Sequence, residues 1–381
     1  MLHVRVVAGS GGGPDKTILR SAGYVDPTQL RIAAAYIHPH NDPGILGLRQ
    51  RAGEWGCPFY EIGETGPLDP STVRSLLNLC RKLRVAVWHG HDYKSNVLGL
   101  MLRRWWPMRL VTTVHGWTHD TARTRLYYHI DNLCLTRYDH VMAVSPMLVE
   151  HCRSLGVREE QLSYVPNGIA LEDYVPGDRA VMRKALGLAD GALAIGVVGR
   201  LSVEKGVDRA IATLAALREK PAYADTQLHL IGDGPQRGQL DGMVESLGLR
   251  GAVHFHGWQA DTRRFYDALD LLLLPSHTEG LPNVVLEAMA MNVPVAATDV
   301  GGVRELLDEG RCGTILNQDA TTWPLHLAPL LVSVARRHEL ARQARQRVMS
   351  HYAFEKRMAR EVAVYQRVLS IQRPQTLRRA A

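Results

Sequence analysis

The sequence has no long apolar run, and this excludes a helix that crosses a membrane. Its longest uncharged apolar stretches, such as residues 271–275, are far shorter than the roughly 18 to 20 residues that a bilayer requires. The start of the chain is too short for an export signal and instead predicts a first strand entering a glycine turn. We therefore expect a cytoplasmic protein, with peripheral contact at the inner face of the membrane left open.

Cysteine and low-complexity sequence are scarce as well. The chain has only five cysteines, an odd number without a CxxC pair, which argues against a disulfide framework and a structural zinc site. Reduced, mostly buried thiols are expected instead. The positions are Cys57, Cys80, Cys134, Cys152 and Cys312.

The chain does have enough length for two cores. At 381 residues, 46% of them hydrophobic, it exceeds what one core usually supports. Short β-like runs alternate with helical stretches, which predicts an α/β fold of two doubly wound, Rossmann-like domains with parallel sheets. The predicted strands are residues 4–8, 31–37, 85–89, 110–115, 140–144, 194–198, 227–231, 252–256, 271–274 and 293–297.

Composition also predicts the domain boundaries. We expect an N-terminal domain over residues 1–170, a linker over 171–191 rich in turn residues and mixed charge, and a C-terminal domain over 192–350. Residues 351–381 predict a final helix with one apolar stripe, followed by a basic tail. The stripe consists of Phe354, Met358, Val362, Tyr365 and Leu369.

Positive charge is concentrated near the C-terminus. The net charge is +7, and residues 336–381 contain twelve Lys and Arg against three Glu, which leaves the rest of the chain slightly acidic. A basic helical tail can touch anionic lipid or nucleic acid, but more often it is a solvated helix face. We expect no nucleic-acid partner.

Two acids, Glu279 and Glu287, lie where an apolar strand gives way to a helix. The run 271–274 ends at Pro275, so the first carboxylate is expected in a loop and the second about one turn into the helix. Parallel α/β sheets bind ligands outside the carboxyl ends of their strands, and the first amides of a helix there favour an anion. The stretch predicts a site for a phosphate with hydroxyls beside it.

This stretch resembles the E-x7-E signature of retaining glycosyltransferases of the GT-B fold, and its surroundings resemble glycosyltransferase family 4, the glycosyl transferases group 1. The resemblance implies two Rossmann-like domains that face an interdomain cleft, with the final helix packing back on the N-terminal domain. It also implies that Glu279 contacts the hydroxyls of the donor sugar and that Glu287 holds the ribose of the nucleotide. The resemblance is dense from about residue 167 to residue 305 and sparse before residue 115.

A loop at residues 199–206 follows a predicted strand and carries two cations. Arginine offers a planar fork to phosphate oxygens, lysine adds a point charge, and a glycine-bounded loop can aim both at one diphosphate. By resemblance, Arg200 and Lys205 neutralise the diphosphate and stabilise it as it departs. A merely solvated loop is the plainer alternative.

A second glycine-rich turn, at residues 9–16, follows the first predicted strand. Its spacing is not GxGxxG and no clear acid closes the next strand, which argues against a nicotinamide site. By resemblance, Gly12 and Gly13 approach the donor phosphate. Asp15 and Lys16 are candidates on the acceptor side.

Histidines gather near the predicted strand ends of the first half. By resemblance, His115 contacts the transferred sugar, with Asp120 as a nearby assistant, although a structural histidine is the alternative. The HxH pairs at residues 38–40 and 89–91 could indicate a metal, but no carboxylate pattern accompanies them. We therefore expect loop histidines there, with His91 lining the acceptor cleft.

Apart from the acceptor-side candidates named above, the candidate site residues form two groups. The catalytic candidates are His115, Arg200, Lys205 and Glu279. The donor-binding candidates, which by resemblance include a hinge asparagine, a glycine turn beneath the nucleotide and a histidine that brackets the base, are Gly12, Gly13, Asn167, Gly199, Gly232, Gly234, His256, Gly280, Leu281, Pro282, Asn283, Val284 and Glu287.

No D-x-D triplet occurs, a pattern with which many sugar transferases hold a divalent ion on the diphosphate. Arg200, Lys205 and helix amides must then supply the positive charge, so we expect neither a metal nor another cofactor. The expected enzyme is of the hexosyltransferase type (EC 2.4). It moves a sugar from a nucleotide-diphosphate sugar, its co-substrate, to a glycan, lipid-linked or small-molecule acceptor.

Two other classes stay open. A non-catalytic two-domain sugar-binding protein would normally carry an export signal and would need no diphosphate clamp. A nucleotide-sugar 2-epimerase of the same fold would bind the same donor. The donor base, the donor sugar and the acceptor do not follow from the sequence, although the basic and aromatic segment 102–109 could rest in a membrane interface and reach a lipid-linked acceptor.

Overall fold

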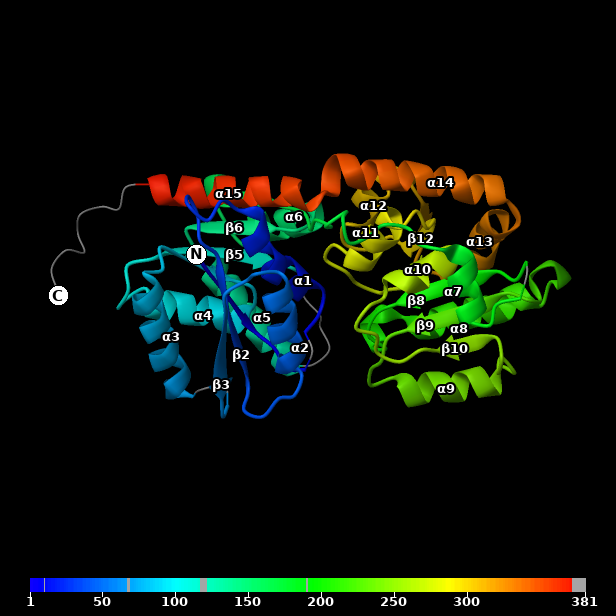
Figure 1. Cartoon of the computed structure of the whole chain (residues 1–381), viewed down its shortest axis with the longest axis horizontal. Coiled ribbons are helices and arrows are strands. Elements are labelled where there is room, and N and C mark those ends of the chain that lie inside the picture. The colour runs from blue at the N-terminus through cyan, green and yellow to red at the C-terminus, as the bar shows by residue number, and fades with distance from the viewer. Residues whose placement is uncertain (10, 67–68, 117–121, 190, 372–381) are drawn as a thin grey trace. The chain divides into compact units, whose positions relative to one another are not determined.

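The computed structural model of the chain has two compact units (Figure 1). The first unit comprises Met1–Asn167 with Glu355–Ala381, and the second unit comprises Gly168–Phe354. The structure describes residues 1–9, 11–66, 69–116, 122–189 and 191–371. Each unit is an α/β layer structure built on its own parallel sheet.

The first unit contains a seven-stranded sheet in the order β3-β2-β1-β4-β5-β6-β7, in which every described pair is parallel. Its strands are β1 (Leu2–Val6), β2 (Ala33–Pro39), β3 (Phe59–Glu64), β4 (Val87–Gly90), β5 (Arg109–Val114), β6 (His140–Ala143) and β7 (Leu162–Tyr164). Its helices are α1 (Gly13–Arg20), α2 (Ile45–Glu54), α3 (Pro70–Leu83), α4 (Tyr93–Leu102), α5 (Ala122–Leu135), α6 (Pro146–Ser154) and α15 (Phe354–Ser370).

The second unit contains a six-stranded parallel sheet in the order β10-β9-β8-β11-β12-β13. Its strands are β8 (Ala194–Val198), β9 (Gln227–Ile231), β10 (Val253–Phe255), β11 (Leu271–Leu274), β12 (Val295–Thr298) and β13 (Thr314–Leu316). Its helices are α7 (Arg179–Ala185), α8 (Val207–Arg218), α9 (Arg237–Ser246), α10 (Arg263–Ala268), α11 (Asn283–Ala290), α12 (Val303–Leu306), α13 (Trp323–Val332) and α14 (Val334–Arg347).

Local sequence explains where many of the helices begin. A side-chain oxygen just before the first turn accepts a hydrogen bond from an otherwise unsatisfied backbone N–H group, and proline at that turn fixes a helical φ. Proline opens α1, α3 and α6. The capping side chains are Asp69 for α3, Asp92 for α4, Ser145 for α6, Asp178 for α7 and Ser333 for α14.

All ten predicted strands are present, and three further strands were not predicted. The missed strands are β3, β7 and β13, each of which lies at an edge of its sheet. Edge strands are partly exposed and carry no continuous apolar run, so the pattern that revealed the central strands is absent from them.

The final helix α15 packs on the first unit, where it covers β4, β5 and β6 (Figure 1). Val364, Tyr365 and Val368 contribute to one core cluster with Val87, Val111 and Met142. The predicted apolar stripe is partly wrong. Leu369 is 46% exposed, whereas two charged residues that were not predicted to face inward, Arg357 and Glu361, are 2% and 1% exposed.

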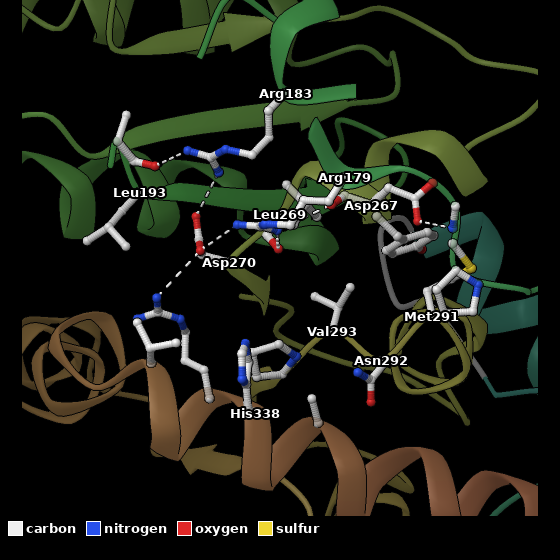
Figure 2. A pocket seen from close by; sticks show the side chains of 18 of the residues that line it. Arg179, Arg183, Leu193, Asp267, Leu269, Asp270, Met291, Asn292, Val293 and His338 are labelled. Atoms are coloured by element: carbon white, nitrogen blue, oxygen red, sulfur yellow. Dashed lines mark hydrogen bonds and ion pairs between the residues drawn. The ribbon is translucent and has the colours of Figure 1, made fainter. Parts of the chain in front are cut away.

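The second unit has a pocket of about 500 Å³ at the amino edge of its sheet, where residues preceding β8, β11 and β12 meet (Figure 2). Asp270 lies at its centre and accepts hydrogen bonds from the backbone N–H of Ala194 at 2.9 Å and from Arg179 at 2.8 Å. Nitrogens of Arg183 and Arg337 lie 3.2 Å and 3.6 Å from the same carboxylate. Helix α7 lies within the segment that was expected to be a linker. Its contacts with Asp270 hold it against the second unit.

Replacing Asp270 with asparagine is expected to lower the free energy of unfolding by about 3 kcal/mol, because three arginines lose their shared counter-charge at a site that is only 8% exposed. Urea unfolding followed by circular dichroism measures the change. The matched control is Asp225→Asn at an exposed position of the same unit, which should leave the midpoint unchanged. An Asp270→Asn midpoint equal to that of the wild type would show that the arginines need no counter-charge.

Part of the basic C-terminal region makes internal contacts. Arg345 and Arg347 of α14 donate to backbone carbonyls of the second unit, and Arg347 also pairs with Asp308 at 2.9 Å. Residues 372–381 of the predicted tail lie outside the described part of the chain. Within the described part, every helix is too short or too polar to span a bilayer.

Segment 102–109, for which contact with a membrane interface was left open, is only partly available for such a contact. Arg103 and Arg109 both pair with Asp139, and the indole N–H of Trp106 donates to a backbone carbonyl at 2.7 Å. Trp105 remains 55% exposed. Peripheral membrane contact, which the sequence left open, would therefore depend on few side chains of this segment.

Candidate functional site

Four loops of the second unit meet at the carboxyl edge of its sheet, because β9, β8, β11 and β12 are neighbours there. Their backbones pack too closely for side chains. Gly232 has φ +144°, and a Cβ atom on it would lie 1.8 Å from the carbonyl oxygen of Gly199. Gly301 has φ +57°, and its Cβ would lie 2.2 Å from the carbonyl oxygen of Glu279. Glycine at these positions lets the loops form one continuous surface.

Glu279 lies in the loop after β11, as predicted, and its carboxylate already has two partners. Its Oε1 accepts from Nζ of Lys205 at 2.7 Å and from the hydroxyl of Ser276 at 2.7 Å. The Glu279 side chain is 9% exposed and that of Lys205 is 30% exposed. The structure thus brings together an acid and a cation that the sequence placed in separate motifs.

Arg200 follows β8 and is exposed. Among the described residues its guanidinium has no hydrogen-bond or ion-pair partner. Lys205 ends the short 3-10 turn Val203–Lys205, and Gly206 after it is the N-cap residue of α8. Lys205 is paired with Glu279, so Arg200 is the cation of this loop that has no ion-pair partner in the described part of the chain.

Glu287 lies in the second turn of α11, also as predicted, and is 4% exposed. The phenol of Tyr266 donates to its Oε2 at 2.9 Å. Asn283 and Val284 open α11, and their backbone N–H groups precede the first hydrogen bond of the helix, which runs from Val285 to Pro282. Gly280, Leu281 and Pro282 complete the loop between the two acids.

His256 lies just after β10, beside two further histidines. Its Nε2 lies 2.9 Å from Nδ1 of His229, and the two rings are stacked. Burial is the main cause that lowers the pKa of His229 to about 3, and burial followed by the charge of His254 lowers the pKa of His256. The pair is therefore neutral at pH 7. Gly234, in the loop after β9, packs against the backbone of Leu201.

The glycine turn of the first unit is built around a buried acid. Helix α1 begins at Gly13. The backbone N–H of Gly12, the residue before it, donates to the Asp15 carboxylate at 2.5 Å. Asp15 is fully buried, pairs with Arg5 at 2.7 Å and accepts from the phenol of Tyr36 at 2.9 Å. The predicted acceptor contact of Asp15 does not fit this position, because its carboxylate has no exposed surface.

The expectation of loop histidines is wrong for His38 and His89. His38 belongs to β2 and His89 to β4, and they are 7% and 0% exposed. His91 follows β4 but is 6% exposed, so it lies within a buried cluster and does not line an open surface. The sequence near the HxH pairs has no carboxylate pattern, but the structure brings a carboxylate to this cluster from α15. Glu361 of that helix lies 3.6 Å from Nε2 of His3.

His115 follows β5 at the carboxyl edge of the first sheet, as predicted, and its Nε2 lies 3.1 Å from Nδ1 of His91. Lys16 is half-buried on α1, and Asn167, 5% exposed, ends the first stretch of this unit. Asp120 lies outside the described residues.

Comparison with protein families gives one match in each half of the chain. A family model described as glycosyl transferases group 1 matches residues 192–331, and one described as a glycosyl transferase 4-like domain matches residues 3–168. The chain belongs to the group 1 glycosyltransferases. The first match contains Arg200, Lys205, Glu279 and Glu287, and the second contains the glycine turn and His115.

Named relatives of this glycosyltransferase include two enzymes with different acceptors. A D-inositol 3-phosphate glycosyltransferase of Actinosynnema mirum is 28% identical over 278 residues, covering 68% of this chain and 67% of the relative. An N-acetyl-alpha-D-glucosaminyl L-malate synthase of Bacillus anthracis is 25% identical over 317 residues, covering 81% and 82%.

Solved structures show the GT-B fold. HepE of Anabaena, in complex with UDP, superposes with a TM-score of 0.81 at 19% identity, over 96% of this chain and 100% of that one. A sucrose-phosphate synthase of Thermosynechococcus elongatus has a TM-score of 0.82 at 20% identity, over 97% and 99%.

Sequence reasoning missed a residue that supports the site of this glycosyltransferase. Arg209 of α8 is buried and donates to the carbonyl of Pro275 at 3.1 Å and to that of Gln318 at 2.6 Å, with its guanidinium 4.5 Å above the Trp323 ring. Burial lowers the pKa of Arg209. It fixes the start of the loop that carries Glu279. The available signal was a lone cation on the apolar face of α8.

Proposed function

We propose that this glycosyltransferase transfers a hexosyl group from a nucleotide-diphosphate sugar with retention of anomeric configuration and without a metal ion. The observation that carries the proposal is the Lys205–Glu279 pair at the carboxyl edge of the second-unit sheet, in the loop that also carries Arg200, whose guanidinium has no partner among the described residues. Cations for a diphosphate and a carboxylate for sugar hydroxyls are thereby held within one surface.

Donor binding follows from the charges of this surface. The diphosphate binds to Arg200 as a two-pronged contact and to the opening amides of α11, which favour an anion. A phosphate oxygen competes with Glu279 for the ammonium of Lys205. The Glu279 carboxylate, still oriented by Ser276, then accepts hydrogen bonds from the donor sugar.

Glu287 is the proposed partner of the ribose hydroxyls. Tyr266, fully buried, donates to one of its oxygens and so fixes the direction of the carboxylate. HepE was solved with UDP and with UDP-glucose, and this supports a uridine nucleotide as the first donor to test.

Transfer proceeds on one face of the sugar. The bond from the anomeric carbon to the diphosphate breaks while Arg200 and Lys205 stabilise the departing charge. The acceptor hydroxyl attacks the same face of the short-lived oxocarbenium-like ion, and its proton passes to the leaving diphosphate. Glu279 is assigned to sugar hydroxyls, so no carboxylate nucleophile is invoked. The acceptor is a glycan, a lipid-linked sugar or a small molecule.

A donor screen followed by product analysis tests the proposal. One UDP-, GDP- or ADP-sugar is expected to raise the melting temperature of the protein, because a ligand bound only by the folded state stabilises it. With that donor and an acceptor pool, proton NMR should show a product with the anomeric configuration of the donor, at an equal rate with EDTA. Inversion, loss of the rate with EDTA, or isomerisation of the donor without an acceptor would each contradict it.

A further inference from the structure

A continuous chain of buried hydrogen bonds connects α15 to His115 within the first unit. Nε2 of His115 lies 3.1 Å from Nδ1 of His91, and Nε2 of His91 lies 2.8 Å from Nδ1 of His3. Nε2 of His3 lies 3.2 Å from the phenol of Tyr365, which donates to Oε1 of Glu361 at 2.6 Å. Apart from His115, each member is at most 6% exposed.

One end of this chain of hydrogen bonds is charged, and this fixes which atom donates at each step. The other oxygen of Glu361 lies 3.1 Å from the guanidinium of Arg357, which also donates to the carbonyl of Pro166 at 2.9 Å. A carboxylate paired with arginine only accepts hydrogen bonds. The single proton of Tyr365 is therefore committed to Glu361, and the phenol oxygen can only accept from its other neighbours.

Each neutral imidazole has one N–H donor and one acceptor nitrogen. Because the Tyr365 oxygen can only accept, the position of the proton is fixed on each histidine of the hydrogen-bond chain in turn. His3 donates from Nε2 to Tyr365 and accepts at Nδ1 from Nε2–H of His91. His91 in turn accepts at Nδ1 from Nε2–H of His115. Burial is the main cause that lowers the pKa of His3 to about 4, and it lowers the pKa values of His91 and His115 well below the usual value, so the rings are neutral.

A side branch must have the opposite tautomer. Nδ1 of His89 lies 2.6 Å from the Tyr365 phenol, which can only accept, so His89 carries its proton on Nδ1. Its Nε2 lies 2.8 Å from the hydroxyl of Thr113, which then donates to it. The network therefore predicts one Nδ1–H ring beside three Nε2–H rings.

We propose that Glu361 sets the tautomer of His115 from the far end of this chain, so that Nδ1 of His115 is kept as an acceptor for a substrate hydroxyl. That Nδ1 has no hydrogen-bond partner among the described residues, and His115, unlike the fully buried Asp15, is a partly exposed residue whose Nδ1 lies just below the surface. Glu361 and Tyr365 are positioning residues, since they act through His3 and His91. The inference rests on the proposed function, because it assumes that His115 contacts a substrate.

A metal ion is the competing explanation for the same cluster. Ligand atoms of His3, His89 and His91 lie within 4.8 Å of one another. Both nitrogens of each of these rings, however, already have a hydrogen-bond partner. A bound metal would have to break those bonds, so the two explanations predict different proton positions.

Nitrogen-15 NMR of histidine-labelled enzyme distinguishes them without any substrate. Long-range proton–nitrogen spectra should show His3, His91 and His115 as Nε2–H tautomers and His89 as the Nδ1–H tautomer, with signals assigned from single His→Gln variants. Any other pattern, or stoichiometric zinc in the purified protein, would overturn the proposal. An absence of transfer with every donor would count against the proposed function alone.

Glu361→Gln tests the direction of the chain. The glutamine carbonyl can replace the oxygen that faces Arg357, and its amide can donate to Tyr365, whose proton is then released toward the histidines. His115 should shift toward the Nδ1–H tautomer, and kcat should fall about tenfold or more with a smaller change in the donor KM. Glu355→Gln, exposed on the same helix, should change neither.

Glu361→Gln leaves the buried Arg357 without a counter-charge, so the folding of this variant is checked by circular dichroism. A second variant tests the same role of Glu361 without an unpaired buried charge. Arg357→Met with Glu361→Gln removes both charges and should show the same shift of His115. A folded single or double variant that keeps the wild-type tautomers would contradict the role of Glu361.

Discussion

The Arg200→Ala enzyme is expected to lose about 100-fold or more in kcat, the size of effect seen when one preorganised donor to a developing negative charge is removed. Arg200 is exposed and has no partner among the described residues, so its loss should not alter folding. Steady-state kinetics with the donor identified by melting-temperature screening measures the effect, and the melting temperature without donor should equal that of the wild type.

Arg250→Ala is the matched control for Arg200→Ala. Arg250 belongs to the same unit but precedes β10, at the opposite edge of the sheet, and its side chain is 63% exposed. The control should retain the wild-type kcat. If Arg200→Ala and Lys205→Ala both stayed within about twofold of it, the diphosphate would have to bind elsewhere and the proposed clamp would be wrong.

Glu279→Gln is expected to lower kcat/KM by about 100-fold. A hydrogen bond to a charged group contributes about 1.5 to 3 kcal/mol, and the carboxylate is proposed to accept such bonds from the sugar only once Lys205 has turned to the diphosphate. The neutral amide has one acceptor oxygen in place of two. Donor hydrolysis and transfer are both measured, since a misplaced sugar also becomes accessible to water.

Two further variants locate the origin of the Glu279 effect. Glu219→Gln, exposed at the end of α8, should have no effect on kinetics. Ser276→Ala keeps the carboxylate but removes its 2.7 Å hydroxyl partner, so a loss of about tenfold is expected from orientation alone. A Glu279→Gln enzyme with wild-type kcat/KM would rule out the proposed role in donor recognition.

Central strands and the loops that follow them were predictable from the sequence. Buried parallel strands have continuous apolar runs, and the motif residues Arg200, Glu279 and Glu287 come directly after or near such runs. The positions of both acids, one in a loop and one in a helix, were predicted for this reason. The edge strands β3, β7 and β13 were missed because half-exposed strands lack that run.

Long-range polar contacts were not predictable in the same way. The buried face of α15 was predicted from the spacing of its apolar residues alone. That prediction placed Leu369 inward and left out Glu361. A buried glutamate departs from the rule that charged residues face solvent. Its burial depends on partners far away in the sequence, such as His3, and the local sequence does not show them. The pairing of Lys205 with Glu279, 74 positions apart, is of the same kind.

The discontinuous make-up of the first unit has a consequence for biosynthesis. Its sheet is encoded before residue 168, but the helix that covers β4, β5 and β6 begins at Phe354, after the whole of the second unit has been translated. Domains generally fold as units while the chain emerges from the ribosome. The apolar face of the nascent first sheet therefore stays uncovered until α15 has been synthesised, and this face is exposed to chaperones during that interval.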